Sequence, residues 1–312
     1  MEDRVDTVDH VSAFIHAMKT RRNLSSRTLK AYESDLRGFE RFLDGIAMQD
    51  VGTGDIQRLV THLESGGLCA SSIRRKLASV KVFFGYLQTE GIIQRAPMWT
   101  TRERYRIPKQ LPKVISRQEV VKILSVAHSR FANSQQGSES ARFGAMRNML
   151  AVELLFSLGL RIDELTGLNV DDVDPVSGNV VVHGKGRKER LLYLSSTEVR
   201  KLIERYLPYR AAVAIDAQAL FVNRAGRRLG NGSVGRVFAS LCDEAGIQRH
   251  YTPHCLRHTM ATMLIENGAD VRSVQEILGH SSISTTEIYI HVSRKRKRDV
   301  LGRFNERNNM RF

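Results

Sequence analysis

The most informative part of the chain runs from Thr252 to Val292 and reads TPHCLRHTMATMLIENGADVRSVQEILGHSSISTTEIYIHV. Thr252 followed by Pro253 predicts the start of a helix, because proline is well suited to the first helical position. His254 and Arg257 are three residues apart, so we expect them on one face of that helix. They lie near its N-terminus, where exposed amides and the helix dipole favour an anion.

The end of the same stretch predicts a loop between two helices. Gly279 is placed to end one helix, which leaves His280 on the connection. Ser284 or Thr285 can cap a second helix, and that helix would carry Tyr289. Tyr289 is one of eight tyrosines in the chain and alone would be assigned to a core.

A zinc site is the first alternative for the histidines of this stretch, because His254 and His258 are four residues apart. A metalloprotease helix would carry glutamate where this chain has Cys255. Arg257 would also repel a divalent cation. We therefore expect no metal.

Two further motifs lie upstream of this stretch. Residues 158–165 read LGLRIDEL, in which Gly159 can end one helix and Arg161 can begin the next, with Glu164 one turn later. Alone, this would indicate a surface ion pair. Asn179–His183 and Arg190–Leu194 are typical of two strands, joined by a glycine-containing turn that holds Lys185. Neither a P-loop nor a G-x-G-x-x-G motif is present, so we expect no nucleotide site.

Helical periodicity dominates most of the remaining chain. Four short helices are predicted, near residues 8–18, 29–43, 55–63 and 73–87, with Ser25 or Ser26 and Ser71 or Ser72 as caps. Downstream, Ser116 and Glu119 form an S-x-x-E capping box, and a long helix should run from Arg142 to Gly159. The polar insert 129–140 is expected to be a loop of low order.

Prolines at 97, 108 and 112 interrupt the helical pattern and predict a linker. We therefore expect a helical domain over residues 1–95, a linker over 96–112 and a second domain over 113–312. The fold class is mainly α with a small antiparallel sheet. The acidic, polar N-terminus is unlike a signal peptide, no apolar run spans a membrane, and three cysteines without CxxC spacing favour a reducing cytoplasm.

The charge is strongly positive: the 312 residues carry 48 Lys and Arg against 33 Asp and Glu, a net +15, with an isoelectric point near 10.1. Such an excess indicates a polyanionic partner, usually nucleic acid. The basic side chains expected to follow a DNA backbone are Arg21, Arg22, Arg27, Lys30, Arg74, Arg75, Lys76, Lys81, Arg187 and Lys188.

The polar residues of the motifs together suit attack on a phosphodiester. Arginines bind nonbridging oxygens in pairs of hydrogen bonds, and fixed cations stabilise the charge of the transition state. A tyrosine hydroxyl can attack phosphorus and hold the DNA as an ester, while a lysine can supply a proton to the leaving oxygen.

The chain resembles the tyrosine recombinases, also called the phage integrase family, and within it the Xer-type branch. The resemblance covers nearly the whole chain and rests on GLRxxEL, GKGxKER, HxxRH and LGH, with a tyrosine nine residues after the last histidine. It implies a SAM-like four-helix core-binding domain, followed by an α-rich catalytic domain. The N-terminal bundle matches only in its general pattern.

The resemblance also implies residue roles. Arg161 and Arg257 would clamp the scissile phosphate, and Lys185 would be the general acid. His254 would assist proton transfer, His280 would bind a nonbridging oxygen, and Tyr289 would be the nucleophile. Glu164 would be a positioning residue. No cofactor is implied.

The partners implied are a specific double-stranded DNA site and three further recombinase subunits, identical or not, with accessory proteins allowed. The tail 293–312 would dock on a neighbouring subunit. The insert 129–140 and the long linker fit a mobile-element enzyme as well as a chromosome-dimer resolvase. A type IB topoisomerase, a DNA-binding regulator without activity and a zinc hydrolase remain alternatives.

Overall fold

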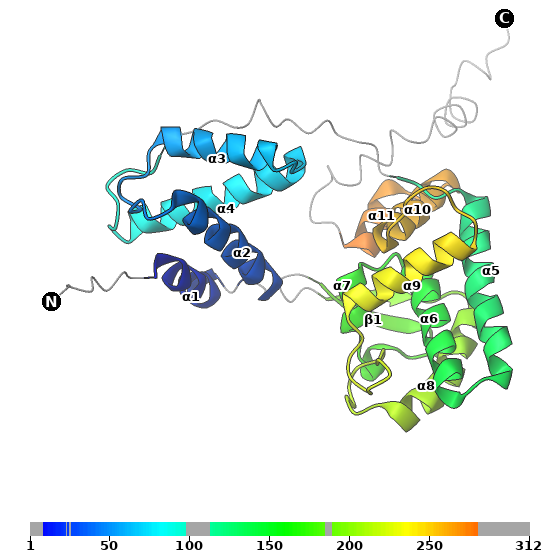
Figure 1. Ribbon diagram of the computed structural model, residues 1–312. Coiled ribbons are helices and arrows are strands. Elements are labelled where there is room, and N and C mark those ends of the chain that lie inside the picture. The colour runs from blue at the N-terminus through cyan, green and yellow to red at the C-terminus, as the bar shows by residue number, and fades with distance from the viewer. Residues whose placement is uncertain (1–8, 23, 25, 98–112, 185–188, 280–312) are drawn as a thin grey trace, which may run out of the picture. The chain divides into compact units, whose positions relative to one another are not determined.

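The computed structural model describes residues 9–22, 24, 26–97, 113–184 and 189–279. Contacts between Cα atoms divide the chain into two compact units, Met1–Gln110 and Leu111–Phe312. Both are mostly helical, and the described part contains one short antiparallel sheet (Figure 1). The predicted fold class is confirmed. The described helices include none that is long and apolar enough to cross a membrane.

The first unit is a bundle of four helices, as predicted. They are α1 (His10–Arg22), α2 (Ser26–Leu43), α3 (Thr53–Ser65) and α4 (Ala70–Thr89). Phe14, Leu36, Phe83 and Phe84 are fully buried between them. The ring of Phe14 meets that of Phe83 edge-on, with centroids 5.5 Å apart, so aromatic packing joins the first and last helices.

The start of α4 differs from the prediction, which placed the cap at Ser71 or Ser72. The helix begins at Ala70 with Cys69 in the N-cap position, and the Cys69 carbonyl accepts from the Ile73 amide at 3.1 Å. The two serines lie in the first turn, with their hydroxyls 3.2 Å from the Cys69 sulfur. Cysteine is not a preferred cap, so the usual capping signal placed the boundary two or three residues too late.

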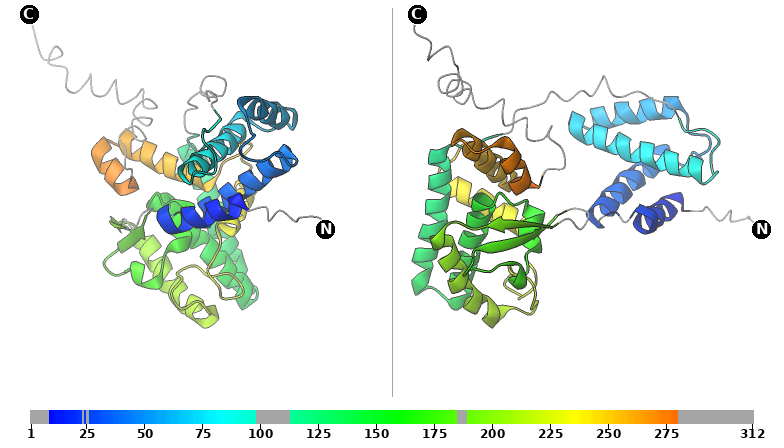
Figure 2. Two further views of the ribbon diagram at one scale, coloured as in Figure 1. Left: turned by 90° about the vertical axis from the view of Figure 1, so that its left-hand side faces the viewer. Right: turned by 180° about the vertical axis from the view of Figure 1, so that it is seen from behind.

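The second unit is built around one central helix, α6 (Glu139–Ser157), against which α5 (Arg117–Asn133), α8 (Thr197–Val213), α9 (Asn231–Glu244) and α10 (Pro253–Glu266) pack (Figure 2). Leu150, Leu154 and Leu155 of α6 are fully buried in this core. The remaining helical elements are α7 (Ile162–Gly167), α11 (Val271–Leu278) and the 3₁₀ turns η1 (Ser134–Gln136) and η2 (Val170–Asp172). α6 is therefore the frame on which the smaller elements are placed.

The insert 129–140 is not the loop that its polar composition predicted. Helix α5 continues to Asn133, η1 follows, and α6 begins at Glu139, three residues before the predicted start. Phe131 packs against the core, and the Ser134 hydroxyl donates to the Phe131 carbonyl at 2.7 Å. The Ser138 hydroxyl then accepts from the Ala141 amide at the start of α6. The polar residues of this insert thus cap helix α6 or face solvent, and they do not form a loop.

The predicted capping box of α5 is confirmed. The Ser116 hydroxyl accepts from the Glu119 amide at 3.2 Å, and the Glu119 carboxylate accepts from the Ser116 amide at 2.9 Å. Each group satisfies an amide that the helix itself leaves without a partner.

The two strands pair antiparallel, as predicted. They are β1 (Asn179–His183) and β2 (Glu189–Tyr193), so β2 begins one residue earlier than expected. Val182 lies opposite Arg190, and Val180 lies opposite Leu192. The side chains of these four residues point to the inner face, because alternate residues of a strand share a face. Residues 185–188, including Lys185, lie outside the described part.

Candidate active site

The first part of the site is the N-terminus of α7. Gly159 has a positive φ of 60°, and a Cβ at that position would collide with Met260, so the turn between α6 and α7 requires glycine. Arg161 is the N-cap residue, as the sequence predicted. Its amide donates to Glu164 Oε2 at 2.8 Å, and its Nη1 donates to Oε1 at 2.7 Å. The side chain of Arg161 remains 39% exposed, so it is open to a ligand.

The second part is the carboxylate of Glu164, which is buried with 5% of its side chain exposed. Arg190 donates to both carboxylate oxygens, Nη1 to Oε1 at 2.9 Å and Nη2 to Oε2 at 2.8 Å. Arg257 Nη1 lies 3.7 Å from Oε2. Burial alone would raise the pKa of Glu164, but the bonds from Arg190 and from Arg161 outweigh it and lower the pKa to about 2.

The third part is Arg257 in the second turn of α10, which begins at Pro253 as predicted. Arg257 is buried, with 1% of its surface exposed to solvent. Nη1 donates to the Gly159 carbonyl at 2.6 Å, and Nη2 donates to the Leu278 carbonyl at the end of α11. Arg257 therefore links three chain segments.

His254 lies one turn before Arg257 and is exposed. Its ring lies 4.4 Å from that of His258, centroid to centroid, nearly perpendicular to it. Partial loss of water around the ring, together with the positive charges of Arg257 and Arg161, lowers the pKa of His254 below its usual value. At neutral pH the ring is therefore uncharged and able to accept a proton.

The structure thus brings together Arg161, Glu164, His254 and Arg257 from α7 and α10. Three other predicted site residues, Lys185, His280 and Tyr289, lie outside the described residues, and so do Arg187, Lys188, the linker from 98 to 112 and the tail 293–312. Glycine 279, with a φ of 63°, ends α11 as predicted, directly before His280 in the sequence.

One residue of the cluster was missed. Arg190 was assigned only to a strand, although it is the last residue of the GKGxKER motif. Its side chain is 13% exposed and donates through Nε to the Ile277 carbonyl at 2.9 Å, besides its two bonds to Glu164. An arginine beside Leu192 on the inner face of a strand was the signal that could have identified it, because a buried charge needs a partner.

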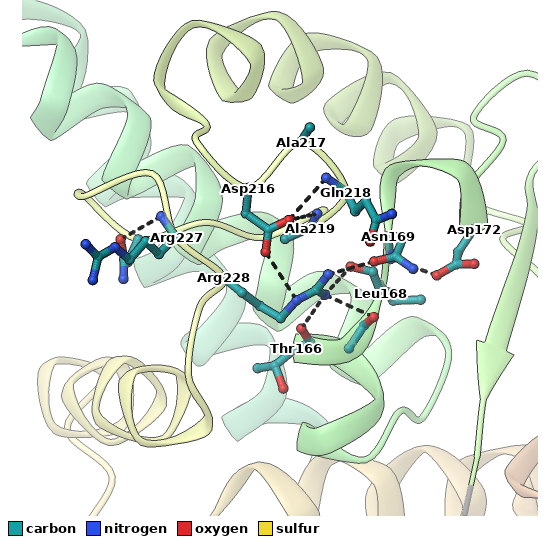
Figure 3. A network of polar contacts seen from close by, with 12 residues as sticks. Thr166, Leu168, Asn169, Asp172, Asp216, Ala217, Gln218, Ala219, Arg227 and Arg228 are labelled. Atoms are coloured by element: carbon teal, nitrogen blue, oxygen red, sulfur yellow. Dashed lines mark hydrogen bonds and ion pairs between the residues drawn. The ribbon is translucent and has the colours of Figure 1, made fainter. Parts of the chain in front are cut away.

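The C-terminal end of α7 is held by a further arginine, Arg228. Figure 3 shows Arg228 reaching from the segment after α8 to the last turn of α7. Its Nη1 lies 3.1 Å from the carbonyl oxygens of Thr166, Gly167 and Leu168, and its Nη2 lies 2.7 Å from Asn169 Oδ1. Both ends of this short helix are therefore fixed by arginines from elsewhere in the unit.

The basic residues of the first unit divide into two groups. Arg75 and Lys76 bind the buried carboxylate of Asp35, Lys76 at 3.2 Å, and Asp35 also accepts from the Ser79 hydroxyl. Arg21 pairs with Glu90. The exposed side chains are those of Arg21, Arg22, Lys30, Arg74, Arg75 and Lys81, while the side chain of Arg27 is outside the described part. Arg75 and Lys76 thus stabilise the bundle, whatever else they contact.

Replacing Glu164 by glutamine is expected to destabilise the second unit in a pH-dependent way. The folded-state pKa lies below the ordinary value of 4.5, so the carboxylate contributes stability above pH 4.5 and loses it as the pH falls through 2. Glu164→Gln should lower the free energy of unfolding by about 3 kcal/mol at pH 7 and by about half of that at pH 3. Urea unfolding at both pH values measures the difference.

Glu139→Gln is the matched control, because Glu139 is an exposed carboxylate in the first turn of α6. It should change the free energy of unfolding by no more than about 0.5 kcal/mol at either pH. An equal loss for Glu164→Gln at pH 7 and pH 3 would contradict the assignment of a charged, arginine-bound carboxylate.

Comparison with known proteins identifies the family of both units. Residues 113–296 match the model of the phage integrase family, and residues 11–91 match that of the phage integrase N-terminal SAM-like domain. The chain belongs to the phage integrase family. The tyrosine recombinase XerD of Listeria monocytogenes serotype 4b (strain F2365) is 36% identical over 309 residues, which cover 96% of this chain and 99% of XerD.

Similarity to other tyrosine recombinases is of the same order. XerC of Pelobacter propionicus (strain DSM 2379 / NBRC 103807 / OttBd1) is also 36% identical, over 94% of either chain. A crystal structure of the XerH recombinase bound to palindromic difH, a post-cleavage complex, shares the fold with a TM-score of 0.70 at 22% identity, covering 95% of this chain and 85% of that one. The predicted resemblance to tyrosine recombinases of the Xer type is confirmed.

Proposed function

We propose that this protein is a site-specific DNA recombinase that cuts and rejoins strands through a 3′-phosphotyrosyl intermediate and a Holliday junction. The observation that carries the proposal is the cluster of Arg161, Arg190 and Arg257 around the single buried carboxylate of Glu164. Three guanidinium groups and one carboxylate leave two positive charges among these four side chains. Such an excess beside a helix N-terminus favours an anion of the phosphodiester class.

In the proposed reaction, Arg161 and Arg257 bind the nonbridging oxygens of the scissile phosphate, and His280 donates a further hydrogen bond to one of them. The Tyr289 oxygen attacks phosphorus, the bond from phosphorus to the 5′ oxygen breaks, and a 3′-phosphotyrosyl ester forms. The neutral ring of His254 assists removal of the phenol proton. Lys185 gives a proton to the departing 5′ oxygen. A free 5′ hydroxyl of a second duplex reverses these steps and rejoins the strands.

This chemistry conserves bond energy in the ester, so the proposed reaction uses no ATP. Arg161 and Arg257 would stabilise the charge on the phosphate in place of a metal ion. Four recombinase subunits, identical or of two kinds, would act on two DNA sites in the cytoplasm, with accessory proteins allowed. The first unit would hold the duplex through Arg22, Lys30, Arg74 and Lys81 and through Arg21, Arg27, Arg75 and Lys76, with Arg187 and Lys188 on the second. The tail 293–312 would dock on a neighbour. The proposed reaction is compatible with chromosome-dimer resolution, and also with integration or excision of a mobile element.

Two of the alternatives share the DNA-binding part of this account. A type IB-like topoisomerase would relax supercoils without a specific site, and a regulator would bind DNA without cutting it. A zinc hydrolase built on His254, His258 and His280 would need a third ligand from outside the described residues, which hold no group of three His, Cys, Asp or Glu side chains able to share a metal ion.

A plasmid assay tests the proposal. The binding site is first selected from a library of randomised duplexes, and two copies are placed in direct repeat on a supercoiled plasmid. With EDTA and without ATP, the protein should delete the DNA between the copies and leave a plasmid without the site unchanged. Relaxation of both plasmids would favour the topoisomerase, and specific binding without deletion or cleavage would favour the regulator.

A further inference from the structure

Arg190 connects three elements that the chain places far apart in sequence. Its guanidinium spans both oxygens of Glu164 on α7, while its Nε donates to the Ile277 carbonyl in the last turn of α11. The side chain leaves β2 beside Leu192, on the inner face of the hairpin. Three separate hydrogen bonds, at 2.8 to 2.9 Å, therefore fix one planar group.

The backbone at the end of α11 is packed directly on this guanidinium. A Cβ at Gly279 would lie 3.2 Å from Arg190 Cδ and 3.2 Å from its Nη1, and Gly279 has a positive φ of 63°. A larger residue would press on the arginine in a conformation that is itself strained. Arg190 and Gly279 therefore fit one another.

The carbonyl groups at the end of α11 have no partners within the helix, as at every helix C-terminus. Here the Ile277 carbonyl accepts from Arg190, and the Leu278 carbonyl accepts from Arg257. Two cations also oppose the negative end of the helix dipole. The last turn of α11 is thus held by Arg190 and Arg257, two of the three arginines that contact Glu164.

We infer that Arg190 is a positioning residue of the active site, an inference that rests on the proposed function. It orients the Glu164 carboxylate, which in turn holds the amide and guanidinium of Arg161, and it fixes the point at which the chain leaves α11. Arg190 acts on the reaction through Glu164 and Gly279 and not by contact with the phosphate.

Lysine cannot replace arginine in this role. A lysine ammonium is a point charge with no planar fork, so it cannot bind both Glu164 oxygens and the Ile277 carbonyl at once. Arg190→Lys keeps the charge and loses the geometry. Because misplacing a reacting group by about 1 Å can cost about 100-fold in rate, we expect a rate loss of this order with DNA affinity unchanged within about threefold.

The experiment measures formation of the covalent protein–DNA adduct in a single turnover, with saturating protein and a nicked duplex carrying the selected site. Affinity for the intact duplex is measured in parallel. Arg228→Lys is the matched control, because Arg228 holds the opposite end of α7 through hydrogen bonds to the residues from Thr166 to Asn169 and not to Glu164. Comparing the two variants separates the effect of weaker α7 packing from the effect of losing the Arg190 hydrogen bonds to Glu164.

Arg190→Lys should slow adduct formation about 100-fold, and Arg228→Lys should slow it far less. Arg190→Ala should be equally slow and should recover when guanidinium or ethylguanidinium is added, which a purely structural role does not predict. If Arg190→Lys does not fold, Arg190→Ala with and without added guanidinium decides the question.

Two results would overturn the inference. One is wild-type speed for Arg190→Lys, and the other is a loss for Arg228→Lys as large as that for Arg190→Lys together with no recovery of Arg190→Ala by guanidinium. Failure of the wild type itself to form an adduct would instead overturn the proposed function, so the two failures are distinct.

Discussion

Tyr289→Phe is expected to abolish strand cleavage while leaving DNA binding intact. Removing only the hydroxyl oxygen deletes the atom that attacks phosphorus and no other group of the proposed site. Loss of a covalent nucleophile lowers the rate of an enzyme by roughly 10⁶-fold. Adduct formation should therefore fall below detection, whereas the dissociation constant for the selected duplex should stay within about twofold. Gel separation of adduct in denaturant and a binding titration measure the two quantities.

Tyr193→Phe is the control for this substitution. Tyr193 lies at the end of β2 and is 62% exposed, so loss of its hydroxyl should change neither quantity. Cleavage at the wild-type rate by Tyr289→Phe would assign the nucleophile to another residue. If neither the wild type nor Tyr289→Phe cleaved DNA in any assay, the result would favour a DNA-binding regulator without activity.

Lys185→Ala is expected to slow cleavage of ordinary DNA and to spare a substrate whose 5′ bridging oxygen is replaced by sulfur. A general acid contributes roughly 10²–10⁴-fold to a rate by protonating the departing atom. A thiolate leaves without a proton, so the sulfur substrate makes that contribution unnecessary. Single-turnover cleavage of both substrates by the variant and the wild type gives the comparison.

Arg187→Ala is the matched control, because Arg187 is a second cation two residues after Lys185 in the sequence. Loss of a cation that only binds DNA should slow both substrates by the same factor. An equal loss of Lys185→Ala activity on the two substrates would therefore show that Lys185 contributes charge and is not the proton donor.

Local signals in the sequence predicted most elements of the fold. Ser116 with Glu119, Thr252 with Pro253, and Gly279 each marked a helix end where the structure has one. Such signals act through a few neighbouring residues, so they are legible without tertiary contacts. The predictions were wrong at two places. At the start of α4, Cys69 takes the N-cap position in place of a serine. Over residues 129–140, polar residues continue helix α5 and cap α6 and do not form the expected loop.

The site itself was predicted in part. Spacing alone put Arg161 beside Glu164 and His254 beside Arg257, because residues three apart share a helix face. The meeting of these two pairs depends on how α7 and α10 pack, and spacing contains no information on that. Arg190 was missed for the same reason, since its contact with Glu164 joins β2 to α7.

The structure also gives structural contacts to residues for which the sequence predicted only binding of an anion. Arg257 was expected to face an anion, and the structure adds that it holds the carbonyls of Gly159 and Leu278. Arg75 and Lys76 were expected on a DNA-facing surface, and the structure adds a buried partner for both, Asp35. Basic residues in a strongly cationic chain can thus serve the fold as well as a polyanionic partner.

The central claim is that Tyr289 becomes covalently joined to a 3′ phosphate of DNA. The most direct measurement traps wild-type protein on the nicked duplex, digests the adduct with protease and nuclease, and identifies the nucleotide-bearing peptide by mass spectrometry. We predict one modified peptide, with the nucleotide on Tyr289 and linked through its 3′ phosphate. A nucleotide on another residue, a 5′ linkage, or specific binding of the nicked duplex without any adduct would contradict the account.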